Sequence, residues 1–453
     1  MNYSIIEQLS FYIVQSPGRI IEPSTIDKVK IAFIDTIASG VAGLSEPVVD
    51  ILRANVTKSD IFPQGWLIGS GIVNAMPDEL ALINATICHA VDFDDTGAST
   101  QSHPSALLFP VLMSLSVGKD YTWGDLVNAY VTGLEIFNRL SKLAPFLHSK
   151  GRHPSSTLGI VAATAAGSVL RKLDRVRVEN ALAISSSLSV GLTVNFGTMV
   201  KPLHLGMAAR NAVNAVQWAG LGVEGNRNAF DGHKNFFWAL GYELPSIVDL
   251  NLTDVKELAI HTPGLNVKLF PSCSMSHRLI SIAIELLSLY SAELENINFV
   301  RCFVTPKAKE ILSIDIPSYG LDGKFSGRYL VSRALLSGDV TAKHFTLEAV
   351  TEPRVVEVMQ KTTIEVHPFW TDETDPWTPD SIVVEMNDGR FISGQCTYPK
   401  GHANNPVNLE IITNKLHSAA LEQKIPRKTV DEFCKTVFEL TPGSHFPFGI
   451  CMI

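Results

Sequence analysis

The chain has 453 residues, 46% hydrophobic and 18% charged, which indicates a large buried core in two or three domains, or in one large domain with a smaller one. Its formal net charge of −8 argues against a general binder of nucleic acids or of anionic membranes. We expect a soluble cytoplasmic protein, because no apolar run approaches the ~20 residues that span a bilayer and the first residues lack a signal-peptide pattern. The six cysteines are scattered along the chain, which suits reduced thiols rather than ligands of an iron–sulfur cluster or a structural zinc ion.

The first 265 residues show helical periodicity and no convincing alternation of period two. Residues 24–44 form the first predicted helix, with Ser24 as its cap and apolar residues at helical spacing. The second predicted helix covers residues 78–93 and begins with acidic residues in its first turn. Further helices, rich in small residues that allow close packing, are predicted over residues 104–117, 125–143, 154–171, 176–189 and 202–221.

The pattern changes at about residue 265. Alternating segments predict strands over 299–304 and 363–366, and a hairpin with a tight Gly turn joins 382–386 to 391–393. Helices are predicted between these strands over 275–291, 325–337 and 353–361, and a last helical stretch covers 408–440. We therefore expect a mostly α protein, with a helical domain from residues 1–265, an α+β domain over 266–400 and a helical return over 401–453.

Three basic residues directly precede a proline where a helix is predicted to begin: His103, His153 and Lys201. Proline is favoured at the first position of a helix, since its missing N–H costs nothing there. A cation at this end opposes the helix dipole, so three such starts suggest that something negative lies between them. They predict a pocket for a small carboxylate, with two histidines able to move protons. The simpler alternative at each position is a tolerated cap or a solvated lysine, and His204 could be a packed residue near the same site.

An acidic cluster, Asp92-Phe93-Asp94-Asp95, follows the predicted helix 78–93, and its charges also oppose the dipole. His89 and Asp92 are three residues apart and share one helix face. Three interpretations are open: a divalent-metal site, a carboxylate that orients a catalytic histidine, or a solvated acidic end. The spacing lacks that of known zinc motifs, so we expect no metal.

The later domain adds fewer candidates. His277 lies where a helix is predicted to begin, and Tyr329 follows Lys324 in another helix start. A lone tyrosine of this kind is more often a core residue than a catalytic one. Cys273 is a weak candidate nucleophile, because no feature ties a base to it.

Together these motifs resemble those of the MmgE/PrpD family, in the family's order and spacing over roughly residues 20–400. The resembling segments are 89–96 leading to His103-Pro104-Ser105, 151–155, 197–204 through 208–211, Pro271-Ser272-Cys273 with His277, and Lys324-Phe325-Ser326 with Tyr329. The family includes 2-methylcitrate dehydratases, cis-aconitate decarboxylases and iminodisuccinate epimerases. The resemblance implies a large all-helical domain, a smaller α+β lid, a homodimer, and a cofactor-free active site between the domains.

The resemblance also implies a set of site residues. The positions that match catalytic residues are Asp92, His103, His153, Lys201, His277 and Tyr329, and the expected substrate contacts are Lys201, His204, His277 and Lys324. Phe270 and Ser274 depart from common family patterns, which leaves the substrate open. The segment 195–199 looks more like that of epimerase-type bacterial members.

The function implied is a cofactor-independent lyase that dehydrates or decarboxylates a small di- or tricarboxylate. His103 and His153 would be general acid and base, Lys201 would stabilise an enolate-like carboxylate, and Asp92 would support a histidine. The lid residues His277 and Tyr329 would complete the pocket on closure. The alternatives are an epimerase that uses the same residues, a non-catalytic carboxylate binder, and an aconitase-like cluster enzyme, which the cysteine spacing disfavours.

Overall fold

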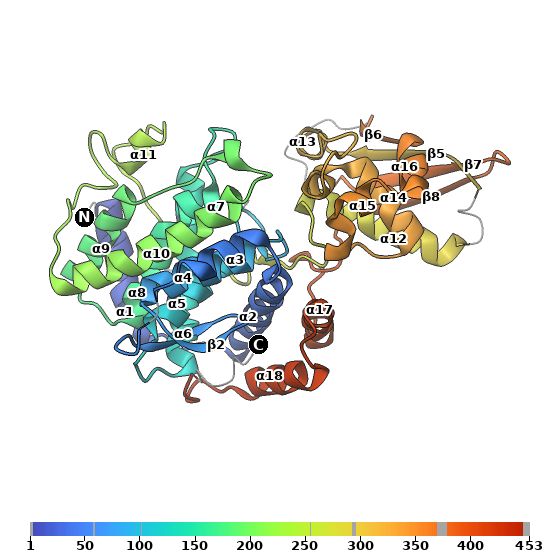
Figure 1. The fold of residues 1–453 in the computed structure, drawn as a ribbon. Helices are drawn as coiled ribbons and strands as arrows, with labels where there is room; N and C mark the ends of the chain where they lie inside the picture. Colours follow the sequence, from blue (N-terminus) through green and yellow to red (C-terminus); the bar gives the residue numbers. More distant parts are fainter. Residues whose placement is uncertain are drawn as a thin grey trace. The chain divides into compact units, whose positions relative to one another are not determined.

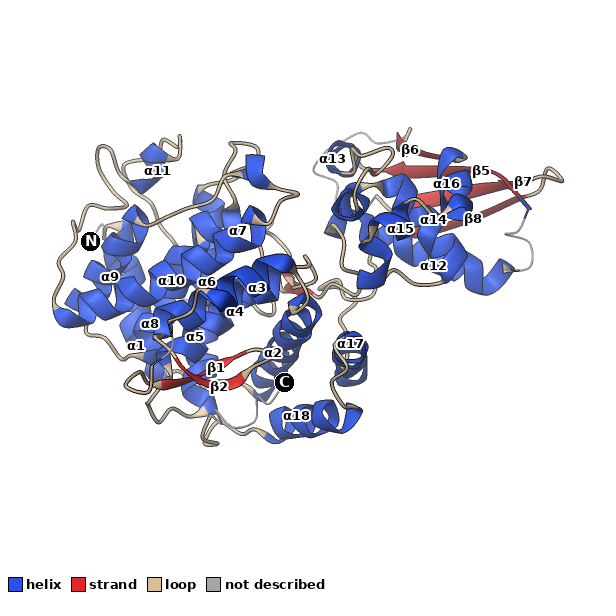
Figure 2. Cartoon of the chain, viewed as in Figure 1, coloured by secondary structure: helices blue, strands red, loops and turns tan. Residues whose placement is uncertain are grey.

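The computed structural model describes residues 3–57, 59–100, 102–253, 255–291, 296–368 and 378–446. The chain is mostly α, as predicted (Figure 2), and it divides into two compact units. Unit 1 contains Met1–Ala90, Asp94–Val267 and Asn408–Ile453, and unit 2 contains Val91–Phe93 and Lys268–Val407. Among the described residues, no single helix is both long enough and apolar enough to cross a membrane.

Unit 1 is built mainly from helices. Their bounds are α1 Ile5–Gln15, α2 Pro23–Gly43, α3 Pro47–Ala54, α4 Pro77–His89, α5 Ser105–Leu115, α6 Trp123–Leu143, α7 Pro154–Thr157, α8 Gly159–Leu170, α9 Arg175–Ser187, α10 Val200–Leu221, α11 Phe236–Ala239, α17 Leu409–Glu422 and α18 Arg427–Glu439. Ser4 and Thr122 cap α1 and α6 through capping boxes, and proline occupies the first turn of α2, α3, α4 and α7. These local signals explain why most of these helices begin where they do.

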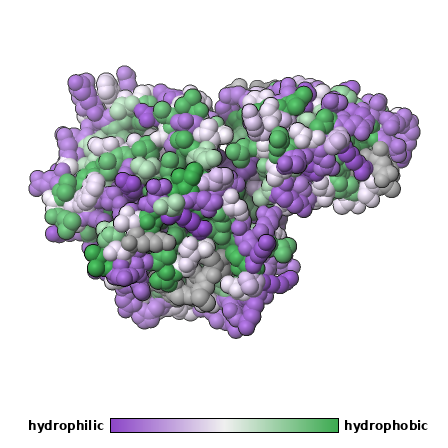
Figure 3. Space-filling view, viewed as in Figure 1, coloured by the Kyte–Doolittle hydropathy of each residue, from purple (hydrophilic) through white to green (hydrophobic). Residues whose placement is uncertain are grey.

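The centre of unit 1 is formed by α5 and α8, in which every residue is buried. Helix α10 packs closely on α4, because Gly206 has no side chain: a Cβ there would lie 2.5 Å from the Leu82 carbonyl oxygen. The C-terminal helix α17 packs on α2 (Figure 1). Helix α18 buries an apolar stripe and leaves its charged residues outside, and Figure 3 shows mostly hydrophilic side chains over this part of the surface.

Unit 1 also contains strands, so the expectation of a purely helical domain is wrong in this detail. Strands β1 Gln64–Leu67 and β2 Gly71–Asn74 form an antiparallel hairpin, and β3 Thr96–Gly97 pairs with β4 Leu265–Asn266. The strands are two to four residues long, and three consecutive residues of β1 are buried. Segments this short show no alternation for sequence analysis to detect.

Unit 2 contains a four-stranded sheet of order β6-β5-β7-β8. Its strands are β5 Ile297–Val304, β6 Thr362–Val366, β7 Asp380–Met386 and β8 Phe391–Cys396; β5 and β6 are parallel and the other pairs antiparallel. Its helices are α12 His277–Tyr290, α13 Pro306–Ile311, α14 Gly327–Ser337, α15 Leu347–Val350 and α16 Pro353–Gln360. Alternate residues of β7 are buried, and they share a core with α12 and α14. The predicted hairpin of β7 and β8 and the three longer helices are confirmed.

Two predicted helices of unit 1 differ in their ends. Helix α4 stops at His89, four residues before the predicted end, and Asp92 has a left-handed φ of 58°. The predicted helix 154–171 divides at Leu158 into α7 and α8. The five described cysteines are free, and Cys451 lies outside the described residues.

Candidate active site

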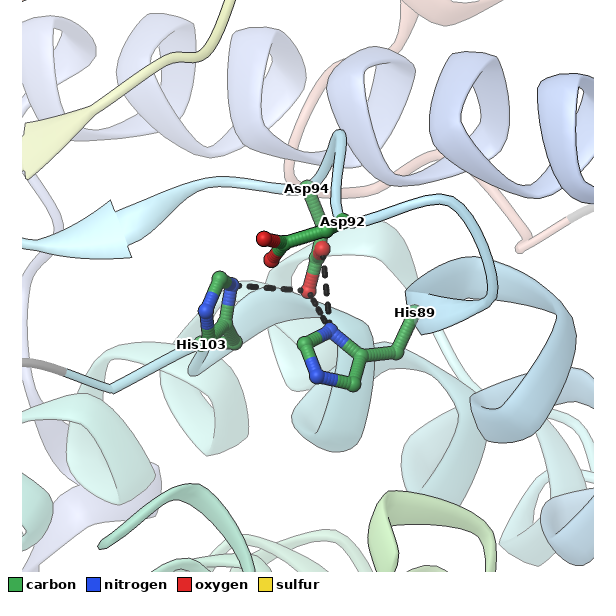
Figure 4. Close-up of side chains that lie close together, drawn as sticks. All are labelled: His89, Asp92, Asp94 and His103. Carbon is green, nitrogen blue, oxygen red and sulfur yellow. Dashed lines mark hydrogen bonds and ion pairs between the residues drawn. The ribbon is translucent and has the colours of Figure 1, made fainter. Parts of the chain in front are cut away.

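A buried carboxylate joins two histidines at the C-terminal end of α4. His89, the last residue of the helix, has its Nδ1 3.0 Å from each carboxylate oxygen of Asp94. His103 Nδ1 lies 3.1 Å from Asp94 Oδ2, so this one carboxylate lies between the two imidazole rings (Figure 4). The ring centroids of His89 and His103 are 4.5 Å apart. The backbone N–H of His103 donates to Ser155 Oγ over 3.0 Å, which fixes its chain segment against α7.

Two further histidines extend this arrangement. His153 is the N-cap residue of α7, and its backbone N–H donates to the carbonyl of Gly191, a residue with a left-handed φ of 104°. His153 Nδ1 lies 3.3 Å from His204 Nδ1, so one of these nitrogens carries a proton and the other accepts it. The rings of His89 and His153 are 5.7 Å apart. We call His89, Asp94, His103, His153 and His204 the histidine cluster.

Lys201 supplies positive charge beside this cluster. It is the second residue of α10, and its Nζ lies 5.2 Å from the ring centroid of Phe196. The edge of Phe196 also packs against His153, at a centroid distance of 4.9 Å. Both His153 and Lys201 are at least nine-tenths buried, so their charges are poorly screened by water. The structure therefore brings together four of the residues predicted from sequence, namely His103, His153, Lys201 and His204.

Burial and neighbouring charges divide the cluster into one anion and several neutral bases. Burial alone would raise the pKa of Asp94, but His103 and His89 together hold it well below its usual value. Burial, with the nearby cations, lowers the pKa of His89 to about 4. Burial first, and then the charges of His89 and Lys201, lower the pKa of His153 well below its usual value. His153 is therefore neutral near pH 7 and able to accept a proton.

The tautomer of His89 follows from these contacts. Ionised Asp94 accepts hydrogen bonds only, so Nδ1 of neutral His89 carries the proton. Its Nε2 then presents a lone pair, and it has no hydrogen-bond partner among the described residues. The site residues predicted from sequence do not include His89. Its position on the helix before an acidic cluster is the signal that could have identified it.

Asp92 has a different partner from the one expected. Its Oδ1 lies 2.8 Å from Lys268 Nζ, which also donates to the Asp92 carbonyl over 2.9 Å. Lys324 Nζ donates to the carbonyl of Val91 over 2.7 Å, and all four residues belong to unit 2. The carboxylate that supports the histidines is thus Asp94. Sequence analysis missed Lys268, although a lysine within the apolar segment 267–270 was a detectable sign of a buried ion pair.

The remaining two predicted residues lie in unit 2. His277 is the first residue of α12 and is buried, with its ring centroid 5.2 Å from that of Phe270. Tyr329 is fully buried in the core of unit 2, where its hydroxyl donates to the carbonyl of His344. Burial raises the pKa of Tyr329. This geometry is that of a core tyrosine, because α14 turns this face towards the sheet and a backbone carbonyl satisfies the hydroxyl.

The side chains of His89, Asp94 and His103 also form a possible donor set for a metal ion. Their potential ligand atoms lie within 4.8 Å of one another, and two imidazoles with one carboxylate are a possible set for a divalent transition metal. The 3.0 Å contacts between His89 Nδ1 and the carboxylate, however, are those of a histidine–aspartate hydrogen bond. The chemistry that fits these contacts best is proton transfer by a supported imidazole.

A cavity of about 250 Å³ lies within unit 1 near the cluster. Its lining includes Ser99, Asn138, Lys142 and His148. The ring of His148 packs against Phe196 at 5.3 Å, and Phe196 contacts His153 on its other side. Polar groups and apolar residues such as Pro145 and Leu158 both line this space, which lies one aromatic ring away from a candidate base.

Comparisons with known proteins identify relatives of this chain. The chain is 27% identical over 432 residues to the human (Homo sapiens) cis-aconitate decarboxylase, covering 92% of this chain and 87% of the relative. It is 27% identical over 375 residues to the mouse (Mus musculus) cis-aconitate decarboxylase, covering 80% and 76%. A cis-aconitate decarboxylase-like protein, oryM, of Aspergillus oryzae is 24% identical over 421 residues, covering 88% and 87%. The MmgE/PrpD N-terminal domain matches residues 7–243 and the MmgE/PrpD C-terminal domain matches residues 270–437, so the chain belongs to the MmgE/PrpD family.

Proposed function

We propose that this protein is a cofactor-independent lyase that removes CO₂ or water from a small di- or tricarboxylate by histidine-based acid–base catalysis. The observation that carries the proposal is the pairing of Asp94 with two imidazoles beside neutral His153 and the ammonium of Lys201. The relatives named as cis-aconitate decarboxylases favour loss of CO₂ from an unsaturated tricarboxylate as the first reaction to test.

Lys201 has the role of an anion anchor. A substrate with several carboxylates needs positive charge in a site from which water is largely excluded, and Lys201 supplies it at the start of α10. When a carbon–carbon bond to a carboxylate breaks, CO₂ leaves and the electron pair stays on the neighbouring carbon. Delocalisation into a second carboxylate creates the charge that Lys201 would stabilise.

His103 and His153 differ in the groups that contact their imidazole rings. His103 contacts the Asp94 carboxylate over 3.1 Å, and an imidazole supported by a carboxylate suits a group that gives a proton to carbon. His153 has a low pKa and no carboxylate among its hydrogen-bond partners in the described chain, which suits a proton acceptor. We therefore assign His103 as the acid and His153 as the base.

Residues of unit 2 remain part of the proposal as predicted. His277 and Lys324 would contact the substrate and Asp92 would contribute to catalysis, whereas the core position of Tyr329 argues against a contact with substrate. The homodimer and the cytoplasmic location also remain predictions, and light scattering during size-exclusion chromatography tests the first of them.

An epimerase is the second candidate, and the pair of histidines favours it. Two imidazoles with different protonation can remove a proton from one face of a carbon and return one to the other face without loss of a group. The residues involved would be the same.

Proton NMR of the chelator-treated protein in D₂O tests these reactions together. The panel is cis-aconitate, 2-methylcitrate, citrate and the stereoisomers of iminodisuccinate. Loss of CO₂ or water establishes the lyase and its substrate class, and deuterium at one carbon of an intact skeleton establishes the epimerase. An unchanged panel, with binding of the same compounds detected by calorimetry, would instead indicate a non-catalytic carboxylate binder. Activity that depends on added iron would contradict the cofactor-independent mechanism.

A further inference from the structure

A second group of buried charged residues lies directly behind the histidine cluster in unit 1. It consists of Asp35 on α2, Asp95 next to Asp94, and Lys415 on α17. Lys415 Nζ lies 2.6 Å from Asp35 Oδ1, and both side chains are at least 98% buried. The two residues are 380 positions apart in the chain, and the packing of α17 on α2 brings the Lys415 ammonium to Asp35.

Asp95 connects this ion pair to the candidate site. Burial raises the pKa of Asp35, and the backbone N–H of Asp95 is one of the groups that oppose this rise. The Asp95 carboxylate accepts the backbone N–H of Ser105 over 3.2 Å. The Ser105 hydroxyl also contacts Asp95, and it lies 2.7 Å from the Tyr130 hydroxyl. Asp94, the neighbour of Asp95, is the carboxylate that contacts His89 and His103.

A buried ion pair is often only structural, and replacing one by apolar residues can even be neutral. Here, however, the buried charged residues form more than one simple ion pair. Three carboxylates, Asp35, Asp94 and Asp95, are fully buried. Lys415 pairs with Asp35, and the imidazoles of His89 and His103 contact Asp94. Burial, followed by the charge of Asp35, raises the pKa of Asp95 well above its usual value.

Lys415 balances Asp35 in a buried ion pair, and the neighbouring carboxylate of Asp94 contacts the two histidines. Removing Lys415 would leave a second buried anion, which only additional protons could balance. Other titratable groups also face this region: the Tyr130 phenol, whose pKa is raised by burial and by Asp95, and the Cys88 thiol on α4, whose pKa is raised by burial and by Asp94. Lys201, at the start of α10, acts on His89 through its charge.

We propose that Lys415 is a positioning residue of the active site, which acts through Asp35 and Asp95 to set the protonation of Asp94 and its two histidines. The proposal deepens the proposed function and rests on it for the catalytic consequence. Its electrostatic part concerns the free protein alone and is measured without substrate.

Two single variants that change the buried net charge in opposite directions distinguish this role from a structural one. Lys415→Met removes a positive charge, so the unit of His89, Asp94 and His103 should take up its proton at higher pH. Asp35→Asn removes a negative charge and should move the same midpoint to lower pH. Each shift should be about one pH unit for charges of this burial. The double variant Asp35→Asn/Lys415→Met restores the balance, and its midpoint should lie close to that of the wild type. Lys415→Arg keeps the charge and is the matched control.

The measurement is NMR titration of the full chain labelled with ¹⁵N-histidine, with resonances assigned from His89→Gln and His103→Gln spectra. Because the groups are coupled, the midpoint belongs to the unit rather than to one residue. Opposite shifts that cancel in the double variant support the proposal. Unchanged midpoints, or two shifts in the same direction, in variants with native circular dichroism would overturn it. If Lys415→Met does not fold, Asp35→Asn and the double variant decide the question.

The catalytic consequence of the proposal is tested by the pH profile of kcat/KM, measured on the substrate that the NMR panel identifies. Its limbs should move as the titration midpoints do. Titration shifts without any turnover would leave the electrostatic role intact and count against the proposed function alone. Turnover with a pH profile that ignores both single variants would refute the positioning role.

Discussion

His103 Nδ1 lies 3.1 Å from Asp94 Oδ2, and the same carboxylate accepts from His89 Nδ1 over 3.0 Å. One buried anion therefore serves two imidazoles. Only one of them has to be protonated to balance it, which leaves the second free to act as a neutral ring. This division allows a proton donor to be kept charged in a site that burial would otherwise make neutral.

Asp94→Asn should lower kcat at least about 10²-fold, since an amide keeps the shape but neither holds an imidazolium nor fixes the tautomer of His89. Steady-state kinetics on the substrate from the NMR panel measures the loss. Asp92→Asn is the matched comparison, because that carboxylate pairs with Lys268. A larger fall in kcat for Asp92→Asn than for Asp94→Asn would return the supporting role to Asp92.

His103→Gln and His153→Gln should each reduce kcat by about 10²-fold or more, the usual scale for an acid or base group. If the assignment of acid and base is right, each variant loses a different limb of the pH–rate profile. His153→Gln should lose the limb that requires a neutral imidazole. The exposed His233→Gln is the control. Full activity in both variants would mean that these histidines only cap or pack the helix starts.

Lys201→Ala should nearly abolish turnover and raise KM, because the ammonium both anchors a carboxylate and stabilises charge in the transition state. Binding of substrate by calorimetry separates the two effects. Lys119→Ala, a change at an exposed lysine of unit 1, should leave both unchanged. Kinetics like those of the wild type in Lys201→Ala would remove this residue from the site.

Tyr329→Phe should keep kcat within about twofold and lower the stability by roughly 1 kcal/mol, the usual net value of one hydrogen bond. The phenol is buried in the core of unit 2 and its hydroxyl already has a backbone acceptor. Thermal unfolding and steady-state kinetics of the same preparation test both statements. A fall in kcat of tenfold or more at normal stability would show that Tyr329 does reach the substrate.

The helix starts of the site could be predicted from sequence because their cause is local. Proline after His103, His153 and Lys201 marks α5, α7 and α10, and the structure brings these three basic residues together. The choice between Asp92 and Asp94 could not be predicted in the same way. It depends on the left-handed backbone at Asp92, a conformation that the identity of an aspartate does not specify.

The ion pairs between residues far apart in the sequence could not be predicted for a different reason. Lys268 pairs with a residue 176 positions away and Lys415 with one 380 positions away. Periodicity reports which face of a helix is buried, but it does not report which element covers that face. A lysine on a buried face indicates an ion pair, and only the packing of α17 on α2 identifies Asp35 as the partner.

The free energy of unfolding should decrease as the pH falls, and His89 should account for part of this pH dependence. Burial lowers its pKa to about 4 in the folded protein, from an ordinary value near 6.5, so the unfolded chain binds the proton first. Unfolding therefore becomes easier as the pH drops through this interval, and the loss levels off below about 4. The difference corresponds to roughly 3 kcal/mol for one such group. His344, whose pKa burial also lowers to about 4, acts in the same interval. Urea unfolding at several pH values should show a slope reduced by about one proton in His89→Gln. The same slope in His89→Gln as in His233→Gln would show that folding does not lower the pKa of His89.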